Sequence, residues 1–148
     1  MRIERCDIDH LDEWVGLRSA LWPEGSPTTL RDEAVELLRA GESQCAVFLG
    51  RSDDGQVVGF AEARMRRDPV NGCDTSPVAF LEGIYVVPAC RRQGLARSLC
   101  AAVEDWGRSH GCVEFGSDAL IDNQASHAFH AALGFEERER VVYFRKPL

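Results

Sequence analysis

The residues with the clearest chemical potential form one short turn, RRQGLAR, which follows an apolar run and precedes a helical pattern. The start of a helix leaves backbone N–H groups without acceptors and concentrates positive dipole, so an anion such as phosphate binds well there. Gly94 and Ala96 would let the anion approach the backbone, and Arg91, Arg92 and Arg97 supply the opposite charge. We therefore predict a phosphate site. The alternative is an ordinary basic loop, because motifs this short also occur by chance.

The elements that must position this turn follow from the spacing of apolar residues. The run before the turn is apolar on both faces apart from Glu82, which is typical of a central strand covered on each side. The second helix is expected to be capped by Thr29. Helical spacing predicts helices over residues 11–22, 29–41, 95–111 and 123–134. Strand patterns cover residues 2–6, 44–49, 56–65, 78–87 and 113–116, with two more strands inside 135–147.

The order of these elements predicts the fold class. It is an α/β protein of the α+β mixed-sheet kind, with a central sheet of about seven strands flanked by about four helices. The chain of 148 residues has the size of one domain, so we expect a single domain over residues 1–148. A hairpin is expected at Asp54-Gly55, and the loop over 66–77 is long enough to carry function.

Composition argues against several classes of function. The apolar fraction of 45% comes without any apolar run long enough to cross a bilayer, so no membrane partner is expected. The charged N-terminus has no secretion signal, which predicts a cytoplasmic protein with its six cysteines reduced. No Cys-x-x-Cys pair is present, and no metal is expected. A net charge of −7 argues against nucleic acid and fits a cationic partner.

The context of the phosphate turn narrows the class of ligand. Neither the P-loop pattern nor the dinucleotide-binding pattern Gly-x-Gly-x-x-Gly is present. The chain instead contains, in this order, Val86-Val87-Pro88, Arg91-x-x-Gly94-x-Ala96, Asn123 and Leu133-Gly134-Phe135. This arrangement resembles the GNAT superfamily of acetyl-CoA-dependent N-acetyltransferases and implies a GNAT-like fold. The resemblance implies that the pyrophosphate of coenzyme A binds the turn, which comprises Arg91, Arg92, Gln93, Gly94, Leu95, Ala96 and Arg97.

The same resemblance implies where the pantetheine arm lies. The backbone of Ile84, Tyr85 and Val86 could pair with its amides as an added strand would, and Asn123 supplies an amide beside the same arm. For Asn123 alone, a helix N-cap is an equal alternative, and the two roles are compatible.

Longer matches point to one branch of the superfamily. The chain is similar to aminoglycoside 6'-N-acetyltransferases through Leu21-Trp22-Pro23, Val70-Asn-Gly-Cys-Asp74, Phe80-Leu-Glu-Gly-Ile84 and the Gly134-Phe-Glu-Glu-x-Glu-Arg-Val141 stretch. This similarity implies a cationic aminoglycoside as the substrate, acetyl-CoA as the acetyl donor, and antibiotic resistance as the outcome. Homodimers are frequent among the resembled enzymes, so a homodimer is expected.

Acetyl transfer to an amine requires a group that accepts the amine's proton, because an alkyl ammonium is protonated at neutral pH. Asp118 is expected to act as base or proton relay and Glu82 to orient the amine, with the reverse assignment left open. The alternatives are a solvated loop carboxylate for Asp118 and a buried, arginine-paired acid for Glu82. The further candidates for substrate binding are Glu139, Trp22 and Pro69. The alternative role for Glu139 is a salt bridge on a strand face, and that for Trp22 is an aromatic residue of the core.

One position departs from the superfamily's pattern. Many of its members place a tyrosine seven residues after the helix-opening Asn, where it is proposed to protonate the leaving thiolate, and this chain has His130 there. His130 could donate a proton if charged, and a histidine on the helix surface is the alternative. Two other functions stay open: acetylation of another small amine or a peptide N-terminus, and a non-catalytic acyl-CoA-binding sensor.

Overall fold

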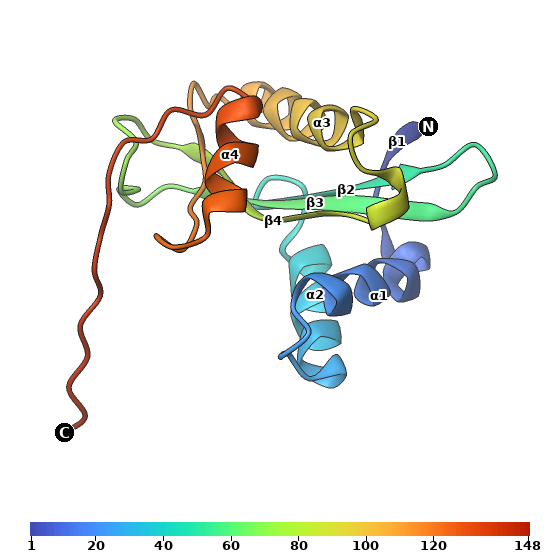
Figure 1. Ribbon diagram of the computed structural model, residues 1–148, viewed down its shortest axis with the longest axis horizontal. Helices are drawn as coiled ribbons and strands as arrows, with labels where there is room; N and C mark the ends of the chain where they lie inside the picture. Colours follow the sequence, from blue (N-terminus) through green and yellow to red (C-terminus); the bar gives the residue numbers. More distant parts are fainter.

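A mixed sheet of five strands forms the centre of the molecule and carries helices on both faces (Figure 1). The structure is a computed structural model and describes residues 1–148. The strands lie in chain order, β1-β2-β3-β4-β5, with only the β4–β5 pair parallel. Their bounds are β1 Arg2–Arg5, β2 Cys45–Arg51, β3 Val57–Arg66, β4 Val78–Val86 and β5 Phe115–Gly116.

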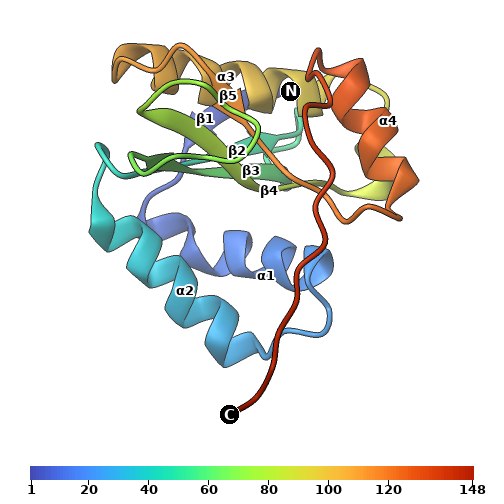
Figure 2. The ribbon, with the colours of Figure 1, turned by 90° about the vertical axis from the view of Figure 1, so that its left-hand side faces the viewer.

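Four helices form the two outer layers, with α1 and α2 on one face of the sheet and α3 and α4 on the other (Figures 1 and 2). Two 3-10 turns, Ile8–His10 and Pro88–Cys90, precede α1 and α3. None of the four helices has both the length and the apolar character needed to cross a bilayer. Their bounds are α1 Leu11–Leu21, α2 Pro27–Ala40, α3 Leu95–Ser109 and α4 Gln124–Ala132.

Two of three predicted helix ends agree with the structure, and one does not. The first helix stops before Pro23 and the last is capped by Asn123, as expected. The predicted cap at Thr29 is wrong, because Ser26 accepts a hydrogen bond from the Thr29 N–H at 3.0 Å and α2 begins at Pro27. Proline at the first helical position lacks the N–H that would have no acceptor there, so the helix extends back to it.

The sheet separates two apolar cores. On one face, Leu95, Leu99 and Val103 of α3 pack against β3 and β4. On the other face, Trp14 of α1 and Leu37 of α2 pack against β2 and β3. Both faces of the central strands are therefore covered, which explains their nearly continuous apolar sequence.

The predicted strand count of about seven is wrong, because residues 135–147 form no strand. We call residues 136–148 the C-terminal segment. It leaves the body of the molecule as an extended chain (Figure 1), and none of its backbone groups takes part in a backbone hydrogen bond. The sequence of residues 135–147 favours strands, but a strand forms only where a neighbour pairs with its backbone, and no backbone hydrogen bond involves residues 136–148.

Candidate active site

A bulge in the middle of β4 sets the position of Glu82. Ala63 lies opposite Leu81 and Glu62 lies opposite Gly83, so that Glu82 is the extra residue of β4. A bulge redirects a side chain and disturbs pairing locally, which explains how an acidic residue fits a central strand. The Glu82 carboxylate accepts a hydrogen bond from Arg66 at 2.9 Å, and its side chain is 25% exposed. Glu82 is thus paired with an arginine, as in the alternative given above, but it is partly exposed to solvent and not buried.

The parallel strands β4 and β5 separate just beyond this point. They pair only at Ala79 with Phe115 and at Phe80 with Gly116. Glu82 and Asp118 each lie two residues past the last pair, on the two sides of the opening. Asp118 is exposed and makes no hydrogen bond or ion pair within the chain. The separation therefore leaves both acids at the mouth of one gap between strands.

The second half of β4 has a free edge along this gap. Ile84, Tyr85 and Val86 pair with β3 on one side, and β5 does not continue along the other. One group already uses that edge, because the Arg91 side chain donates to the Val86 carbonyl at 2.8 Å. The remaining backbone groups of this edge are available to an extended ligand, as in strand addition.

The turn before α3 presents a run of unpaired donors. The backbone N–H groups of residues 92–97 have no acceptor within the chain, and the first helical bond is that from Ser98 to Gly94 at 3.0 Å. Arg92 and Gly94 both have positive φ, 61° and 85°, which curls the backbone so that successive N–H groups face the same side. A Cβ at Gly94 would meet nothing within 4 Å, so the turn is open in front of the helix. The donor set fits a diphosphate.

The three arginines of the turn have different tasks. Arg91 ties the turn to β4 through Val86, and Arg97 donates to the Ala132 carbonyl at the end of α4 at 2.9 Å. Arg92 has no hydrogen-bond partner in the chain and is exposed, so its charge is free to meet an anion. Gln93 donates to the Ala89 carbonyl at 3.1 Å. The buried Leu95 anchors the turn in the core.

Helix α4 brings Asn123 and His130 to the same side of the sheet as the turn (Figure 2). The Asn123 side-chain oxygen accepts from the Ser126 N–H at 3.1 Å, which confirms the cap and leaves the amide N–H₂ free. His130 Nδ1 lies 2.7 Å from the Ser126 carbonyl, which only accepts, so this nitrogen carries a hydrogen. His130 Nε2 lies 2.7 Å from the Ser117 hydroxyl. His130 is therefore half-buried and hydrogen-bonded at both nitrogens, and its partner Ser117 directly precedes Asp118 in the sequence.

The other predicted substrate residues lie in different places. Trp22 follows α1 and packs against β4, because a Cβ at Gly83 would come within 2.6 Å of the Trp22 ring. It therefore touches the residue next to Glu82. Pro69 is exposed on the long loop, and Glu139 is exposed on the C-terminal segment without an ion pair. The structure thus brings Trp22 next to Glu82 and places Asp118 at the matching position beyond β5, whereas no hydrogen bond or ion pair links Pro69 or Glu139 to these residues.

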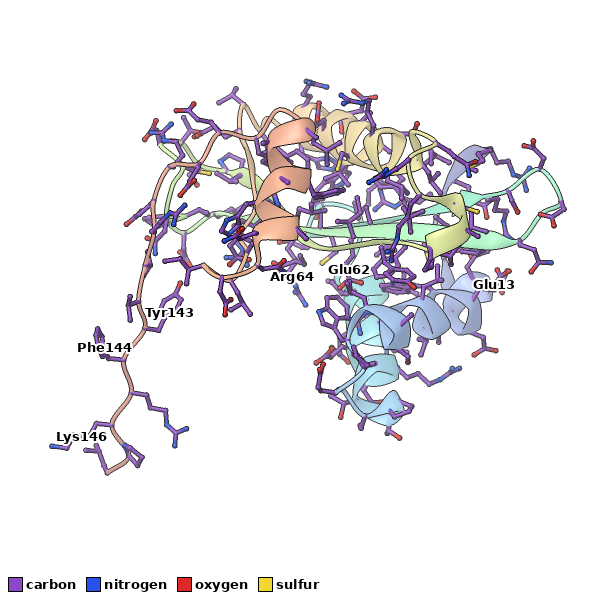
Figure 3. The ribbon with its side chains drawn as sticks, viewed as in Figure 1. Glu13, Glu62, Arg64, Tyr143, Phe144 and Lys146 are labelled. Carbon is purple, nitrogen blue, oxygen red and sulfur yellow. The ribbon has the colours of Figure 1, made fainter.

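A buried ion pair behind Trp22 was not predicted. Arg18 donates to both carboxylate oxygens of Glu62, at 3.0 and 3.1 Å, and Trp14 donates to the same carboxylate at 3.2 Å. Both charged residues are at most 4% exposed. Figure 3 shows Glu62 on the sheet face that points toward α1. Burial raises the pKa of Glu62, and the hydrogen bonds from Arg18 oppose this shift.

The same arginine supports Trp22. The Arg18 guanidinium lies 4.9 Å from the centre of a Trp22 ring, in cation–π range. Trp14, Arg18 and Trp22 are spaced four residues apart, so they share one face of α1 and its end. The sequence contained two indications of this ion pair. Arg18 lies between two tryptophans on one helix face, and Glu62 interrupts an apolar strand.

These features define a class of protein. The site suits a long ligand that carries phosphate. It combines two parallel strands that separate, a free strand edge beside the gap, and an anion-binding turn at the end of that edge. Comparison with known proteins identifies the family: residues 11–135 match the family described as Acetyltransferase (GNAT). The chain belongs to this family, as its sequence resemblance implied.

Individual relatives are similar along nearly the whole chain. An aminoglycoside N(6')-acetyltransferase type 1 from Serratia marcescens is 52% identical over 143 residues, 97% of each chain. The crystal structure of the aminoglycoside 6'-N-acetyltransferase AAC(6')-IG from Acinetobacter haemolyticus, without ligand, superposes with a TM-score of 0.93 at 44% identity, covering 100% of this chain and 99% of that one. The structure of AAC(6')-Iy with the bisubstrate analogue CoA-S-monomethyl-acetylneamine gives a TM-score of 0.92 at 45% identity, covering 99% and 98%.

Proposed function

We propose that this protein transfers the acetyl group of acetyl-CoA to the 6'-amine of aminoglycosides and thereby confers resistance to these antibiotics. The observation that carries the proposal is the similarity, over nearly the whole chain, to proteins named for that activity. One relative was solved with a ligand that joins coenzyme A to an acetylated aminoglycoside. The site geometry supports the proposal because it supplies an anion turn, a free strand edge and two acids in one region.

The residues that would hold the coenzyme follow from their free groups. The N–H groups of residues 92–97 would bond the diphosphate, and the unpaired guanidinium of Arg92 would add charge. Ile84, Tyr85 and Val86 would pair with the amides of the pantetheine arm along the free edge of β4, and Asn123 would donate its free N–H₂. Acetyl-CoA supplies an acetyl group activated as a thioester. A backbone N–H of the same edge would stabilise charge that develops on the acetyl oxygen.

The amine side of the reaction would use the acids at the mouth of the gap. Glu82, already an acceptor for Arg66, would orient the ammonium group, and Asp118 would take its proton directly or through water. Trp22 would pack against a sugar ring, and Pro69 and Glu139 would contact the antibiotic further out. In its charged form, with a hydrogen on both ring nitrogens, His130 would donate the Nε2 proton to the leaving thiolate. A net charge of −7 supports attraction of a polycation at long range.

The substrate test compares two antibiotics that differ at one group. Neomycin carries an amine at the 6' position where paromomycin carries a hydroxyl, so thiol release from acetyl-CoA is expected with the first and at least 100-fold less with the second. Spermidine and a peptide with a free N-terminus complete the panel. Faster acetylation of either of these would overturn the substrate assignment, and tight acetyl-CoA binding without thiol release for any amine would indicate a sensor. Mass spectrometry of the product fixes the acetylated amine.

The catalytic assignment is tested by Asp118→Asn beside Asp122→Asn. Both acids are exposed in the connection between β5 and α4, so the control removes the same charge a few residues away. We expect Asp118→Asn to lower kcat at least 100-fold at unchanged acetyl-CoA affinity, within the usual range for loss of a general base. Equal kcat in the two variants would remove Asp118 from the proton path.

Three broader features belong to the same proposal. We take the chain to act as a single domain over residues 1–148, in the cytoplasm, where acetyl-CoA is made. We also take it to form a homodimer. Neither nucleic acid nor membrane is a partner. The mass of the protein in solution, compared with 16.4 kDa for one chain, tests the dimer.

A further inference from the structure

Arg66, the last residue of β3, binds the acid at which the amine of the substrate is proposed to bind. Its side chain donates to Glu82 Oε1 at 2.9 Å, and no group of the chain donates to Glu82 Oε2. An ionised carboxylate accepts hydrogen bonds at both oxygens, so this ion pair leaves one oxygen for another donor. Because the Glu82 side chain is 25% exposed, that oxygen can be reached from solvent.

An aromatic ring fixes the position of Arg66. The guanidinium carbon lies 3.6 Å from the centre of the Phe80 ring, well within cation–π range. Phe80 is itself buried, in a small apolar cluster with Val70 and Val78. A planar guanidinium at this distance rests on the face of the ring. Arg66 therefore has a defined place, although its side chain is 41% exposed.

The ion pair restrains Glu82 where the sheet does not. Glu82 is the extra residue of the bulge in β4, so no residue of β3 lies directly opposite it. Without a partner, a glutamate side chain samples several rotamers, and binding a ligand then costs this rotamer freedom. The hydrogen bond from Arg66 selects one orientation of the carboxylate before the ligand arrives, which reduces that cost.

Charge alone predicts the opposite role for Arg66. A guanidinium next to the acid that receives an ammonium group repels that group. Arg64 provides the comparison, because residues two apart on a strand share a face, and Arg64 is exposed without a hydrogen bond or ion pair in the chain. Figure 3 shows Glu62 and Arg64 on the sheet face toward α1. The two arginines thus carry the same charge on the same strand face, and only Arg66 holds an acid.

We propose that Arg66 is a positioning residue of the amine site: it binds one oxygen of Glu82 and thereby directs the other oxygen toward the ammonium group of the substrate. This inference rests on the proposed function and deepens it, because it assigns a task to a cation inside a site for cations. The gain from an oriented carboxylate exceeds the repulsion between Arg66 and the substrate.

The experiment compares Arg66→Met and Arg66→Lys with the control Arg64→Met. Methionine keeps a long apolar side chain over the Phe80 ring and removes the charge, and its thioether packs well against aromatic rings. Lysine keeps the charge and a donor but loses the planar group that rests on the ring. Thermal unfolding checks that each variant folds. Calorimetry measures the Kd of neomycin for the protein loaded with coenzyme A and the Kd of coenzyme A itself, and initial rates give kcat and KM.

We expect Arg66→Met to raise the Kd of neomycin about tenfold at unchanged Kd of coenzyme A, because the charge-assisted bond that orients the acid is lost. Arg64→Met should lower the Kd of neomycin by up to about threefold, since it only removes a like charge. Arg66→Lys should lie between the intact chain and Arg66→Met, and kcat should change less than KM. Tighter neomycin binding in Arg66→Met than in the intact chain would overturn the proposal, and so would weaker binding by the lysine variant than by the methionine variant.

A double-mutant cycle shows whether Arg66 acts through Glu82. In Glu82→Gln the ion pair is gone, so adding Arg66→Met should no longer weaken neomycin binding, and an equal loss in both backgrounds would refute the positioning role. The intact chain tests the proposed function separately. If it acetylates neomycin and Arg66→Met behaves like Arg64→Met, the inference alone falls. If it binds neomycin without acetylating it, the proposed function falls and the Kd values still decide the inference, whereas no binding overturns both.

Discussion

Replacing Gly94 by aspartate tests whether the turn before α3 binds the coenzyme's diphosphate. The new carboxylate would stand in front of six N–H groups that have no acceptor in the chain. A Cβ at this position meets nothing within 4 Å, so the side chain has room. The remaining cost to the fold is the positive φ of 85°, a conformation that Asp and Asn tolerate better than most residues.

The size of the effect follows from Coulomb's law. A unit negative charge about 5 Å from one phosphate charge costs about 1 to 3 kcal/mol, for effective dielectric constants between those of water and a protein surface. The carboxylate would also accept some of the free N–H groups as a helix cap does, in direct competition with the ligand. Together these effects predict that coenzyme A affinity falls by about 10- to 200-fold, since about 1.4 kcal/mol is tenfold.

The matched control is Gly94→Asn, which has the same shape and the same backbone strain but no charge. Isothermal titration calorimetry with coenzyme A would measure both variants, and thermal unfolding would check that their Tm values agree within about 4 °C, the equivalent of about 1 kcal/mol. The loss of affinity in the aspartate variant should shrink at high salt. Equal affinities for the two variants would refute the assignment of this turn to the diphosphate.

Three further predictions concern the surroundings of the site. Arg18→Met should cost about 3–5 kcal/mol, because it leaves the buried Glu62 carboxylate without its arginine. Glu62→Leu should cost less, because Arg18 keeps its ion pair with the exposed Glu33, and the double variant should cost less than Arg18→Met; thermal unfolding measures all three. Gly83→Ala should displace the Trp22 ring, which lies 2.6 Å from the new Cβ, and raise KM for the amine about tenfold at unchanged coenzyme affinity. Hydrogen bonds to Glu114, first that from the Thr75 hydroxyl, lower the pKa of its carboxyl group. The ionised carboxylate therefore holds the long loop at neutral pH and releases it as the pH falls below about 4. NMR of the Thr75 amide, which donates to Glu114, measures this release.

Each of these has a control in the chain. Asp12→Asn breaks the exposed pair with Arg31 and should change stability by no more than about 1 kcal/mol. Gly16→Ala adds a methyl group where nothing lies within 4 Å and should leave KM unchanged. Glu114→Gln should make the loop insensitive to acid. The ion-pair argument is contradicted if the double variant is less stable than both single variants. An unchanged KM in Gly83→Ala would contradict the role of Trp22. Loop signals that already shift between pH 7 and 6 would contradict the role of Glu114.

Much of the site could be predicted because single residues broke a pattern. Glu82 interrupts an apolar run and Gly94 stands between arginines at a helix start, and both lie where the structure has a bulge and an anion turn. The bulge itself could not be predicted, because it depends on how β3 and β4 pair and not on either sequence alone. The cap at Ser26 was missed because Thr29 has the same chemistry, and only the proline at the first helical position separates them.

The strand count was wrong for a different physical reason. Strand propensity in residues 135–147 describes side chains that fit a sheet, and it carries no information on which chain provides the neighbour. The absence of turn residues after Phe135 was visible in the sequence and argued against two consecutive strands in one copy. The predicted role of Glu139 is affected in the same way, since this residue lies on the C-terminal segment, whose backbone pairs with no strand.

The position of Asp118 depends on a short element, because β5, which leads to it, is only two residues long. Pairing with β4, the contact of Phe115 with the Phe135 ring, the hydrogen bonds of Glu114 to the long loop and the Ser117–His130 hydrogen bond of 2.7 Å hold this stretch. The turn at Gly94 is instead continuous with the 15-residue helix α3, whose buried face packs on the sheet. The anion turn is therefore fixed by a whole helix, whereas the end of the site that carries Asp118 is fixed by a few separate contacts.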